Sequence, residues 1–355
     1  MNSPDALIIG GGQAGLAAAH ALRQHGLRPV ILEAGAEAVG SWPRYYDSLT
    51  LFSPARFSSL PGLAFGGDPE RYPHRDEVTD YLRRYATRLD ADLRTDHRVS
   101  TVEHRAGRFD VTTTSGVELS APLLIAATGS FNNPHRPALP GLDTFTGTVL
   151  HAGDYRAPNS LADKRIVVVG AGNSAVQIAV ELAEHAHVTL ATRERIRFAP
   201  QRPFGRDVHL WAKLTGADSL PIGPWLTNPP GQPVFDTGRY RTAITARRPD
   251  RRPMFTRLDG DRVHWSDGTT EPIEVLILAT GYHPDLNYLT PLNTLAPSGK
   301  PDQRAGLSTT HPGLGYLGLE WQRILASNTL RGVGRDAAHL IPRLLRARAR
   351  QLGRM

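Results

Sequence analysis

The 355-residue chain contains no cysteine. This absence excludes disulfide bonds, thiolate metal sites, a cysteine nucleophile and an internal redox dithiol. The chain also lacks an apolar run that is long enough to cross a bilayer. Its first strand-like run begins at Ala6, too near the start to leave room for a secretory signal peptide. We therefore expect a cytoplasmic protein without a membrane partner.

Lysine is nearly absent as well. Only three of the 41 basic residues are Lys, and the many Arg residues, which help to give a net charge of +7, are spread along the chain. A nucleic-acid surface would instead show a basic block with interleaved aromatic residues, so we expect no nucleic-acid partner. The basic stretch 343–354 is expected to form a terminal helix with a solvated face.

No set of side chains points to catalysis without a cofactor. The 14 His residues are dispersed, and the sequence shows no HxxxH pair, no carboxylate cluster and no nucleophile–base pair. We therefore expect no metal site. If the protein is an enzyme, its chemistry has to come from bound cofactors.

The segment 6–33 predicts a strand–helix–strand unit with a glycine-rich turn. The turn consists of Gly10, Gly11, Gly12, Gln13, Ala14 and Gly15, and the second strand ends in Glu33. In such a unit the first glycine permits a tight turn, the second lets the backbone approach a pyrophosphate, and the third lets helix and strand pack closely. The diphosphate lies at the helix N-terminus, where free N–H groups and the helix dipole favour anions.

A second unit of this kind spans residues 164–193. Its turn consists of Gly170, Ala171, Gly172, Asn173, Ser174 and Ala175. Glu33 follows Gly10 by 23 residues, and Arg193 follows Gly170 by the same 23 residues. A carboxylate at this position suits a ribose 2′-hydroxyl, whereas a guanidinium suits the 2′-phosphate of NADP. We therefore predict FAD at the first turn and NADPH at the second, with Arg195 as a second contact for the 2′-phosphate.

These units predict an α/β fold with two dinucleotide-binding, Rossmann-like domains. Two strand-like runs each end in Ala-Thr-Gly, at 127–129 and 279–281, and we expect the chain to cross between the domains there. The NADPH-binding domain, 156–274, is then inserted in a discontinuous FAD-binding domain, 1–155 and 275–355. A Pro-rich insertion at about 197–256 is either a substrate-facing lid or a packed satellite, and both interpretations remain open at this point.

Two smaller elements are predicted between the units. Residues 76–89 have the spacing of an amphipathic helix, and we expect an Asp to cap its start. The alternating residues from about 98 to 120 predict an antiparallel element with a Ser-Gly turn.

The stretch 145–155, FTGTVLHAGDY, has no convincing helical or strand period. Together with the two turns and a late ATGY at 279–282, it resembles a pattern of the class B flavoprotein monooxygenases. This family includes flavin-containing monooxygenases, plant indole-pyruvate (YUCCA-type) monooxygenases and related small bacterial flavoproteins. Its pattern is a GxGxxG turn for FAD, FxGxxxHxxx followed by an aromatic residue, a GxGNS turn for NADPH and the ATGY.

The resemblance implies further contacts with the two cofactors. VGSW (39–42) is similar to the glycine–tryptophan turn beside the flavin, and GVGRDA (332–337) is similar to the entry of the C-terminal helix. The implied FAD contacts beyond the first turn and Glu33 are Ser41, Trp42, Thr128, Gly129 and Asp336. The implied NADPH contacts beyond the second turn and the two arginines are Thr280 and Gly281. His151 and Tyr155 belong to the linking pattern, where His151 is implied to position or move the domains rather than to act as a base.

The function implied by the resemblance is that of an NADPH-dependent monooxygenase. NADPH reduces FAD, O2 then gives a flavin C4a-(hydro)peroxide, and one oxygen passes to a small soft nucleophile (N, S or similar) or to a 2-oxo acid. Flavin-containing monooxygenases place an Asn near the flavin where this chain has Phe52 or Ser53. How this protein holds NADP⁺ against the flavin is therefore open.

Three alternatives remain open. Baeyer–Villiger enzymes end the linking pattern in Trp, so Tyr155 disfavours that reaction. A flavin reductase that passes electrons to a quinone or a ferredoxin would need the same two turns, and so would a cofactor-sensing binding protein. The expected partners are a small-molecule substrate and O2, and the oligomeric state, including a homo-oligomer, is open.

Overall fold

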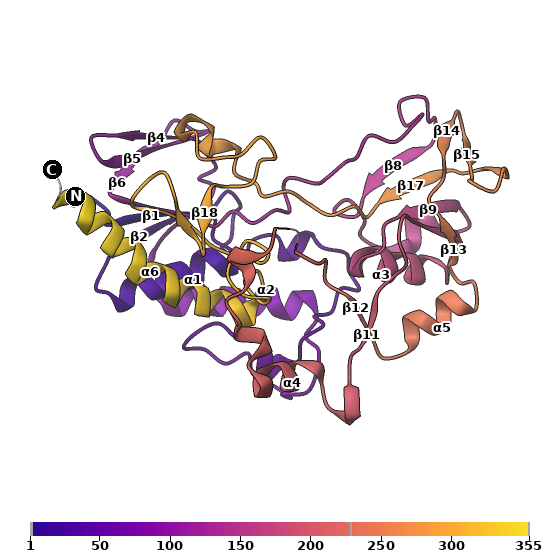
Figure 1. Ribbon diagram of the computed structural model, residues 1–355, viewed down its shortest axis with the longest axis horizontal. Helices are drawn as coiled ribbons and strands as arrows, with labels where there is room; N and C mark the ends of the chain where they lie inside the picture. Colours follow the sequence, from indigo (N-terminus) through magenta and orange to yellow (C-terminus); the bar gives the residue numbers. More distant parts are fainter. Residues whose placement is uncertain (1–2, 228, 354–355) are drawn as a thin grey trace.

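The computed structural model describes residues 3–227 and 229–353, and its two largest sheets lie at opposite ends of the molecule (Figure 1). The first sheet has seven strands, in the spatial order β18 (Gln303–Arg304), β19 (Leu307–Ser308), β20 (Leu314–Tyr316), β7 (Leu123–Ala126), β1 (Ala6–Ile9), β2 (Pro29–Leu32) and β3 (Asp92–Arg94). Its strands from β20 to β3 are parallel, while β18, β19 and β20 are joined by antiparallel pairing.

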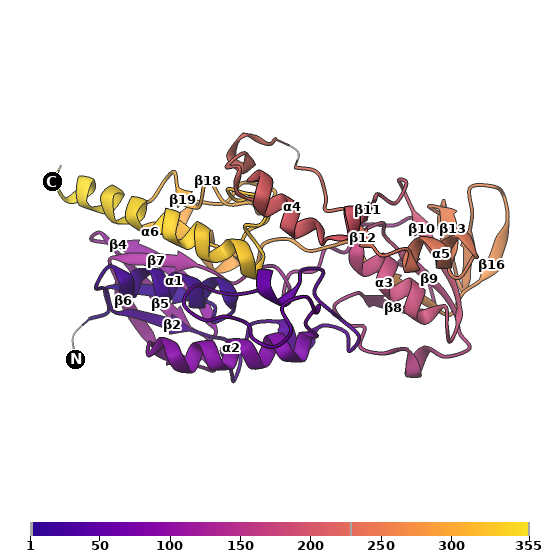
Figure 2. The same cartoon turned by 90° about the horizontal axis from the view of Figure 1, so that it is seen from below.

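Alternate residues of β1 determine what covers each face of the first sheet. Ala6 and Ile8 pack in the cluster that includes the helices, whereas Leu7 and Ile9 pack in the cluster on the opposite face, as the period of two of a strand requires. The helices are α1 (Gln13–Gln24), α2 (Arg75–Leu89) and α6 (Leu330–Leu352). The opposite face is covered by an antiparallel sheet of β4 (Val99–Arg105), β5 (Arg108–Thr113) and β6 (Glu118–Ala121). Figure 2 shows α6 running lengthwise along this first domain.

The expected small elements of the first domain are confirmed, with one correction. The antiparallel element, the helix over 76–89 and the terminal helix all form. The start of α2 is capped by His74, however, and not by an Asp, because the His74 ring accepts the Asp76 N–H while Glu77 accepts the His74 N–H. Asp76 lies instead within the first turn of the helix, where its negative charge interacts favourably with the helix dipole.

The second domain repeats this architecture on a five-stranded sheet. Its strands, in spatial order, are β13 (Asp250–Pro253), β10 (His187–Thr192), β9 (Arg165–Val169), β17 (Val275–Leu278) and β8 (Thr148–His151), all parallel. The sides of this sheet carry α3 (Asn173–Leu182) and α5 (Arg239–Thr245), and an antiparallel sheet of β14 (Arg257–Asp259), β15 (Arg262–His264) and β16 (Thr270–Pro272). The predicted α/β fold with two dinucleotide-binding domains, one inserted in the other, is confirmed.

Two linkers join the domains, 127–147 between β7 and β8 and 279–286 after β17, and they are hydrogen-bonded to each other. His283 N donates to Asn133 O and Asp285 N donates to Gly129 O, both at 2.9 Å. Both β8 and β17 pair within the second sheet. We therefore propose that the second domain runs from β8 to β17, a longer span than 156–274, because strand pairing and not the motif ends decides where the chain crosses.

The Pro-rich insertion leaves the second domain and packs against the first. It includes β11 (Phe198–Pro200), α4 (Val208–Thr215) and β12 (Val234–Asp236). Short 3-10 turns complete the fold: η1 (Trp42–Arg44), η2 (Ala55–Phe57), η3 (Pro158–Leu161), η4 (Pro203–Gly205), η5 (Ala217–Ser219), η6 (Gly223–Trp225) and η7 (Asn287–Leu292). Within the described residues, no helix is both long and apolar enough to span a membrane.

Candidate functional site

A cavity of about 900 Å³ lies in the first domain, and segments from the linkers and the insertion also line it. Nine of the predicted FAD residues line this cavity: Gly10, Gly12, Gln13, Ala14, Glu33, Ser41, Trp42, Thr128 and Gly129. The structure thus brings together residues that lie as far apart in the sequence as the first turn and the first Ala-Thr-Gly. Gly15 and Asp336 do not belong to the lining.

The first glycine-rich turn is tight because its glycines meet backbone. Gly10 has a φ of +103°, and a Cβ there would lie 2.6 Å from the carbonyl oxygen of Ala127. A Cβ at Gly15 would overlap the carbonyl oxygen of Gly10, so Gly15 packs the helix against the turn. Gly12 caps α1 without any side-chain hydrogen bond. The first N–H groups of α1 are therefore free for an anion in the cavity.

Glu33 holds the turn as well as facing the cavity. Its Oε2 accepts the N–H of Gly11 at 2.6 Å, and its Oε1 accepts the N–H of Gly35 at 2.8 Å. These two bonds fix the carboxylate at the end of β2 and leave it further lone pairs. A ribose hydroxyl in the cavity can donate to them.

A second helix begins on the same cavity. Asn328, Thr329 and Leu330 line it, and Thr329 caps α6 without a side-chain hydrogen bond. Gln13 Nε2 donates to Asn328 O at 2.7 Å and Trp42 Nε1 donates to Gln13 Oε1 at 3.3 Å, so the starts of both helices are tied together. Sequence reasoning missed Asn328 and Thr329, although a Thr before a helical segment is a recognisable start signal.

Asp336 lies elsewhere in α6. The helix begins at Leu330, which places Asp336 in its second turn, buried and away from the cavity lining. Its Oδ1 accepts a hydrogen bond from Arg323 Nε at 2.7 Å, and burial raises the pKa of this carboxyl group. The helix begins two residues before the GVGRDA segment, so Asp336 lies inside the helix and not at its entry. The contact between Asp336 and FAD that the resemblance implies stays a prediction.

The second glycine-rich turn lies outside the cavity, at the start of α3. Gly170 has a φ of +145° and Gly172 caps α3 without a side-chain hydrogen bond. A Cβ at Gly172 would have nothing within 4 Å, so the turn is open on this side. Asn173 Nδ2 donates to Pro233 O at 3.1 Å, while its buried Oδ1 has no partner within the described residues. Ser174 follows in the first turn of the helix.

Arg193 and Arg195 lie just beyond the end of β10, beside this turn in the fold. Both side chains are exposed, and neither takes part in an ion pair with the residues that the structure describes. Two unpaired guanidinium groups after the second strand of the unit are suited to a phosphate.

His151 connects the second sheet to a linker. It is buried at the end of β8, where Gly153 N donates to its Nδ1, so Nε2 carries the hydrogen and donates to Gly281 O, each at 3.1 Å. Burial lowers the pKa of His151, which favours this neutral form. Thr280 Oγ1 donates to His135 O on the other linker at 2.5 Å. Both ring nitrogens of His151 are thus used for structure.

The other residues of the linking pattern also serve packing. A Cβ at Gly147 would lie 2.6 Å from the carbonyl oxygen of Glu274, so β8 can approach the entry of β17 only through a glycine. Tyr155 is buried in the core of the second domain and donates to Glu181 Oε2 at 2.8 Å. Phe145 packs against the face of this sheet that carries the antiparallel strands.

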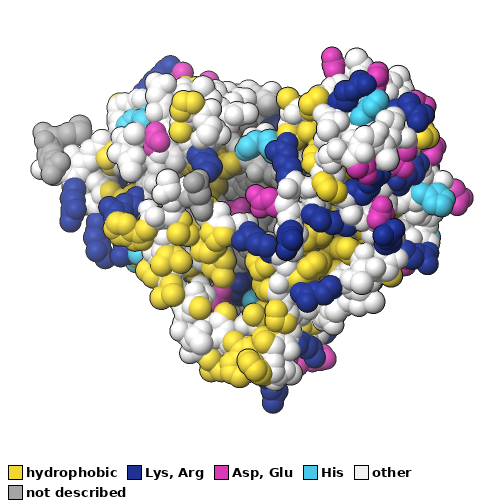
Figure 3. Space-filling view, turned by 45° about the vertical axis from the view of Figure 1, so that its right-hand side comes forward, with side chains coloured by type: hydrophobic (Ala, Val, Ile, Leu, Met, Phe, Trp, Pro, Cys, Tyr) yellow, Lys and Arg dark blue, Asp and Glu magenta, His cyan; other side chains and the backbone are white. Residues whose placement is uncertain are grey.

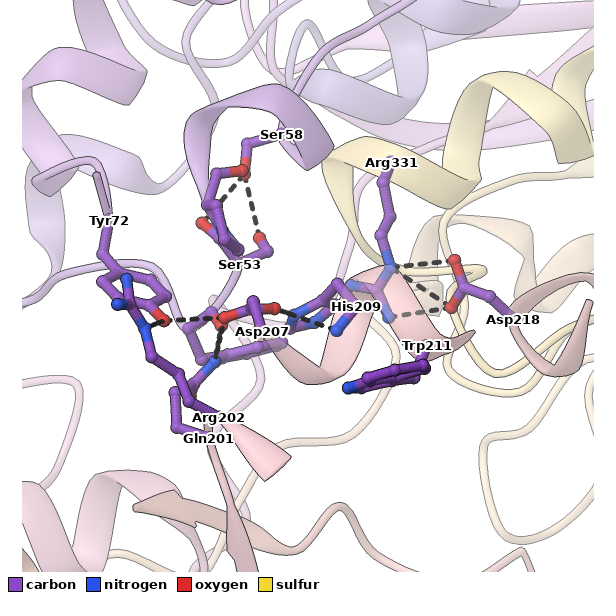
Figure 4. Close-up of polar contacts among 12 residues, drawn as sticks. Ser53, Ser58, Tyr72, Gln201, Arg202, Asp207, His209, Trp211, Asp218 and Arg331 are labelled. Carbon is purple, nitrogen blue, oxygen red and sulfur yellow. Dashed lines mark hydrogen bonds and ion pairs between the residues drawn. The ribbon is translucent and has the colours of Figure 1, made fainter. Parts of the chain in front are cut away.

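A buried carboxylate of the insertion anchors the insertion to the first domain. Asp207 Oδ1 accepts from His209 Nδ1 at 2.7 Å, and its Oδ2 accepts from Tyr72 OH at 2.6 Å and from Gln201 Nε2 at 2.8 Å (Figure 4). Burial alone would raise the pKa of Asp207, but these hydrogen bonds lower it to about 2. Gln201 Nε2 also donates to Phe52 O at 2.9 Å, so the insertion fixes a residue of the wall.

Phe52 and Ser53 occupy the place where an Asn was expected. Both line the cavity, and the Phe52 ring stacks on the ring of His209 at 6.0 Å between centroids. Ser53 Oγ shares a hydrogen bond with Ser58 Oγ at 2.9 Å. The wall at this point is therefore an aromatic ring and a hydroxyl that is already bonded, and it offers no side-chain amide. The insertion's own share of the lining comes from Gly223, Leu226, Thr227, Pro229 and Gln232.

Residues 7–211 match the model of the family described as pyridine nucleotide-disulphide oxidoreductase. The chain belongs to this family. Its curated relatives include an uncharacterized CzcO-like oxidoreductase of Geobacillus kaustophilus, which is 34% identical over 96% of this chain and 98% of the relative. They also include the indole-3-pyruvate monooxygenase YUCCA1 of Oryza sativa subsp. japonica, 30% identical over 79% of this chain and 77% of the relative.

Among solved structures, the chain is similar to a flavin-containing monooxygenase from Stenotrophomonas maltophilia. The TM-score is 0.86 at 30% identity, over 98% of this chain and 99% of that one. The resemblance to the class B flavoprotein monooxygenases is thereby confirmed, and the protein is an oxidoreductase of this family. The disulphide chemistry in the family's description requires thiols, and this chain has no cysteine.

Proposed function

We propose that this flavoprotein oxidoreductase is an FAD- and NADPH-dependent monooxygenase that transfers one oxygen atom from O2 to a small soft nucleophile (N, S or similar) or to a 2-oxo acid. One observation carries the proposal. The start of α1, Thr128 and Gly129 at the end of β7, and residues of the insertion all line one cavity. A cofactor held in it is shielded on the side where a substrate would react.

FAD fits the cavity on three counts. The free N–H groups at Gly12 and Gln13 would bind its diphosphate, and Glu33 would accept from its ribose. Asn328 has a buried Oδ1 without a partner among the described residues, beside the start of α6. The dipole of α6 also favours negative charge in the cavity, beside the start of α1. When bound, FAD supplies hydride acceptance from NADPH and the activation of O2.

NADPH is assigned to the second turn. Gly172 and Asn173 would receive its diphosphate at the start of α3, and Arg193 would bind the 2′-phosphate. The second-turn residues do not line the cavity. The paired linkers, held by His151, therefore have to set the distance between the two cofactors.

The side chains of the cavity wall exclude water and position the substrate. Phe52, Leu226 and Trp321 line the cavity with apolar surface, and Leu226 comes from the insertion. A dry site slows the loss of activated oxygen to H2O2. We assign no acid or base to the reaction, because the conspicuous buried histidine, His151, has both ring nitrogens engaged.

The test is oxygen and NADPH consumption by the purified, FAD-loaded chain with a panel of amines, thioethers and 2-oxo acids. We expect NADPH-dependent O2 uptake that is matched by a product with one added oxygen and by little H2O2. Mass spectrometry of the products separates heteroatom oxygenation from Baeyer–Villiger insertion and from oxidation of a 2-oxo acid.

The opposite result is equally clear. If every substrate leaves H2O2 as the sole product, while a quinone or a ferredoxin is reduced rapidly with NADPH, the protein is a reductase. A chain that binds both cofactors but consumes no NADPH in either assay would be a binding protein.

A further inference from the structure

The segment 202–225 of the insertion, which we call the apolar segment, exposes large hydrophobic side chains and buries its carboxylates. Six large hydrophobic side chains are exposed in the part of the chain that the structure describes, and all six belong to this segment: Phe204, Trp211, Leu214, Leu220, Ile222 and Trp225. Phe204 is 94% exposed, Trp225 73% and Leu214 67%. Figure 3 shows hydrophobic side chains gathered on the lower part of the molecule, where Figure 1 places α4.

The carboxylates of this segment point the opposite way. Asp207 is buried in its network with Tyr72, and Asp218 is buried against Arg331 of α6, whose Nη2 lies 3.0 Å from Oδ1 (Figure 4). Gly223 N further donates to Arg323 O at 3.0 Å. The segment is therefore fixed to the first domain by its polar groups, with its apolar groups outward. A surface on which large hydrophobic side chains gather in this way is expected to contact an apolar partner.

The backbone at Phe204, the most exposed of these residues, has an unusual conformation. Phe204 adopts a φ of +53° and a ψ of +34°, a left-handed conformation that is unusual for a bulky residue. Its ring packs edge-on against Trp211 at 6.1 Å between centroids, and Trp211 Nε1 donates to Pro203 O at 3.0 Å. The two rings thus contact each other at the surface.

The exposed charges of the segment are all positive. Arg202, Arg206 and Lys213 are exposed, whereas both of its carboxylates are buried. The nearby Glu70 is paired with Arg56 at 2.8 Å. Surfaces that bind at the interface of an anionic bilayer typically combine Trp and Phe with Arg and Lys, as this segment does.

We propose that the apolar segment docks on an anionic lipid surface, and that the cavity opens next to this contact. The segment leads directly into Leu226 and Thr227 of the cavity lining, so a docked enzyme would take an apolar substrate from the bilayer. This replaces the expectation of no membrane partner with a surface contact. A second copy of the chain is a poorer occupant, because a two-fold interface would oppose the same three cations to one another.

The experiment is flotation of the purified full chain with vesicles of phosphatidylcholine alone or mixed in equal parts with phosphatidylglycerol. We expect binding to the mixed vesicles, at least about tenfold weaker binding without the anionic lipid, and a loss of binding as salt is raised. The variant Phe204→Ser/Leu214→Ser/Trp225→Ser should bind the mixed vesicles about tenfold less or weaker still. In the wild type, Trp fluorescence should shift to the blue on binding.

A second variant protects the test against misfolding. Arg206→Glu/Lys213→Glu should weaken binding to the mixed vesicles about tenfold, while Arg28→Glu, an exposed charge outside the segment, should leave it unchanged. Bound flavin and the melting temperature should match the wild type in all variants. The proposal is overturned if the wild type does not bind the mixed vesicles. It is also overturned if light scattering shows a dimer that the serine variant abolishes.

Discussion

At the scale of the residue, charge at one position distinguishes two otherwise similar sites. Glu33 is fixed by the N–H groups of Gly11 and Gly35, so its carboxylate has one orientation toward the cavity. Arg193 is exposed and unpaired within the described residues, which leaves its planar guanidinium free to reorient. The first site is therefore pre-organised for a hydroxyl, and the second is adaptable toward a phosphate.

We predict that Arg193→Glu weakens NADPH binding by about 1.5–3 kcal/mol, because a charge-assisted contact with the 2′-phosphate is lost. NADH binding should change little, since NADH has no 2′-phosphate. Titration of both coenzymes by quenching of protein fluorescence measures the two affinities. Arg195→Glu is the matched control. Should it reproduce the selective loss while Arg193→Glu does not, Arg195 is the phosphate contact.

At the scale of the element, two helices begin at glycine-rich turns that differ in how crowded they are. A Cβ at Gly12 would lie 3.3 Å from Cα of Gly40, whereas a Cβ at Gly172 would meet nothing within 4 Å. Both turns leave the first N–H groups of their helix free. The two helix starts therefore offer the same N–H groups. The start of α1 lines the cavity, whereas the start of α3 lies outside it and, among the described residues, has no atoms packed against Gly172.

The pair of substitutions Gly12→Val and Gly172→Val tests this assignment. Gly12→Val should lower FAD affinity by about 10- to 100-fold, because the side chain crowds both Gly40 and the diphosphate. Gly172→Val should retain FAD and lose NADPH affinity instead. Absorbance of bound flavin after purification and an NADPH titration provide the two readouts. Normal flavin content in Gly12→Val would show that the diphosphate does not lie at this turn.

At the scale of the whole molecule, two domains and one insertion have to be held in register. The paired linkers join the domains, and His151 attaches β8 to Gly281 of one linker. The insertion starts in the second domain and is anchored on the first by Asp207 and Asp218. Any movement between the domains therefore also acts on the insertion residues that line the cavity.

We predict that His151→Ala retains FAD but lowers the ratio of oxygenated product to NADPH consumed by about tenfold, with H2O2 released in its place. Two hydrogen bonds of the neutral ring are lost, each worth about 0.5–1.5 kcal/mol. The measurement is product, NADPH and H2O2 in the same reaction. His20→Ala removes a partly buried ring of α1 outside the linkers and should keep the wild-type ratio. Unchanged coupling in His151→Ala would make the linking pattern a purely local packing motif.

Much of the fold and part of the site could be predicted from local sequence. The two turns, the charge difference between Glu33 and Arg193, and the antiparallel element depend on neighbours within a few tens of residues, where backbone sterics and periodicity decide the structure. The absence of cysteine excluded thiol chemistry without any structure. The order of the motifs was enough to predict one domain inserted in another.

The tertiary structure decided what depends on contacts between distant residues. Strand pairing placed β8 and β17 in the second sheet. The start of α6 at Leu330, before the GVGRDA segment, placed Asp336 inside the helix and outside the cavity lining. Only the fold could show that Asp207 and Asp218 are buried while Phe204 is exposed, because burial is set by long-range packing and not by the polarity of a residue. For this reason the role of the Pro-rich insertion could not be predicted from its sequence, whereas its exposed surface in the structure indicates one.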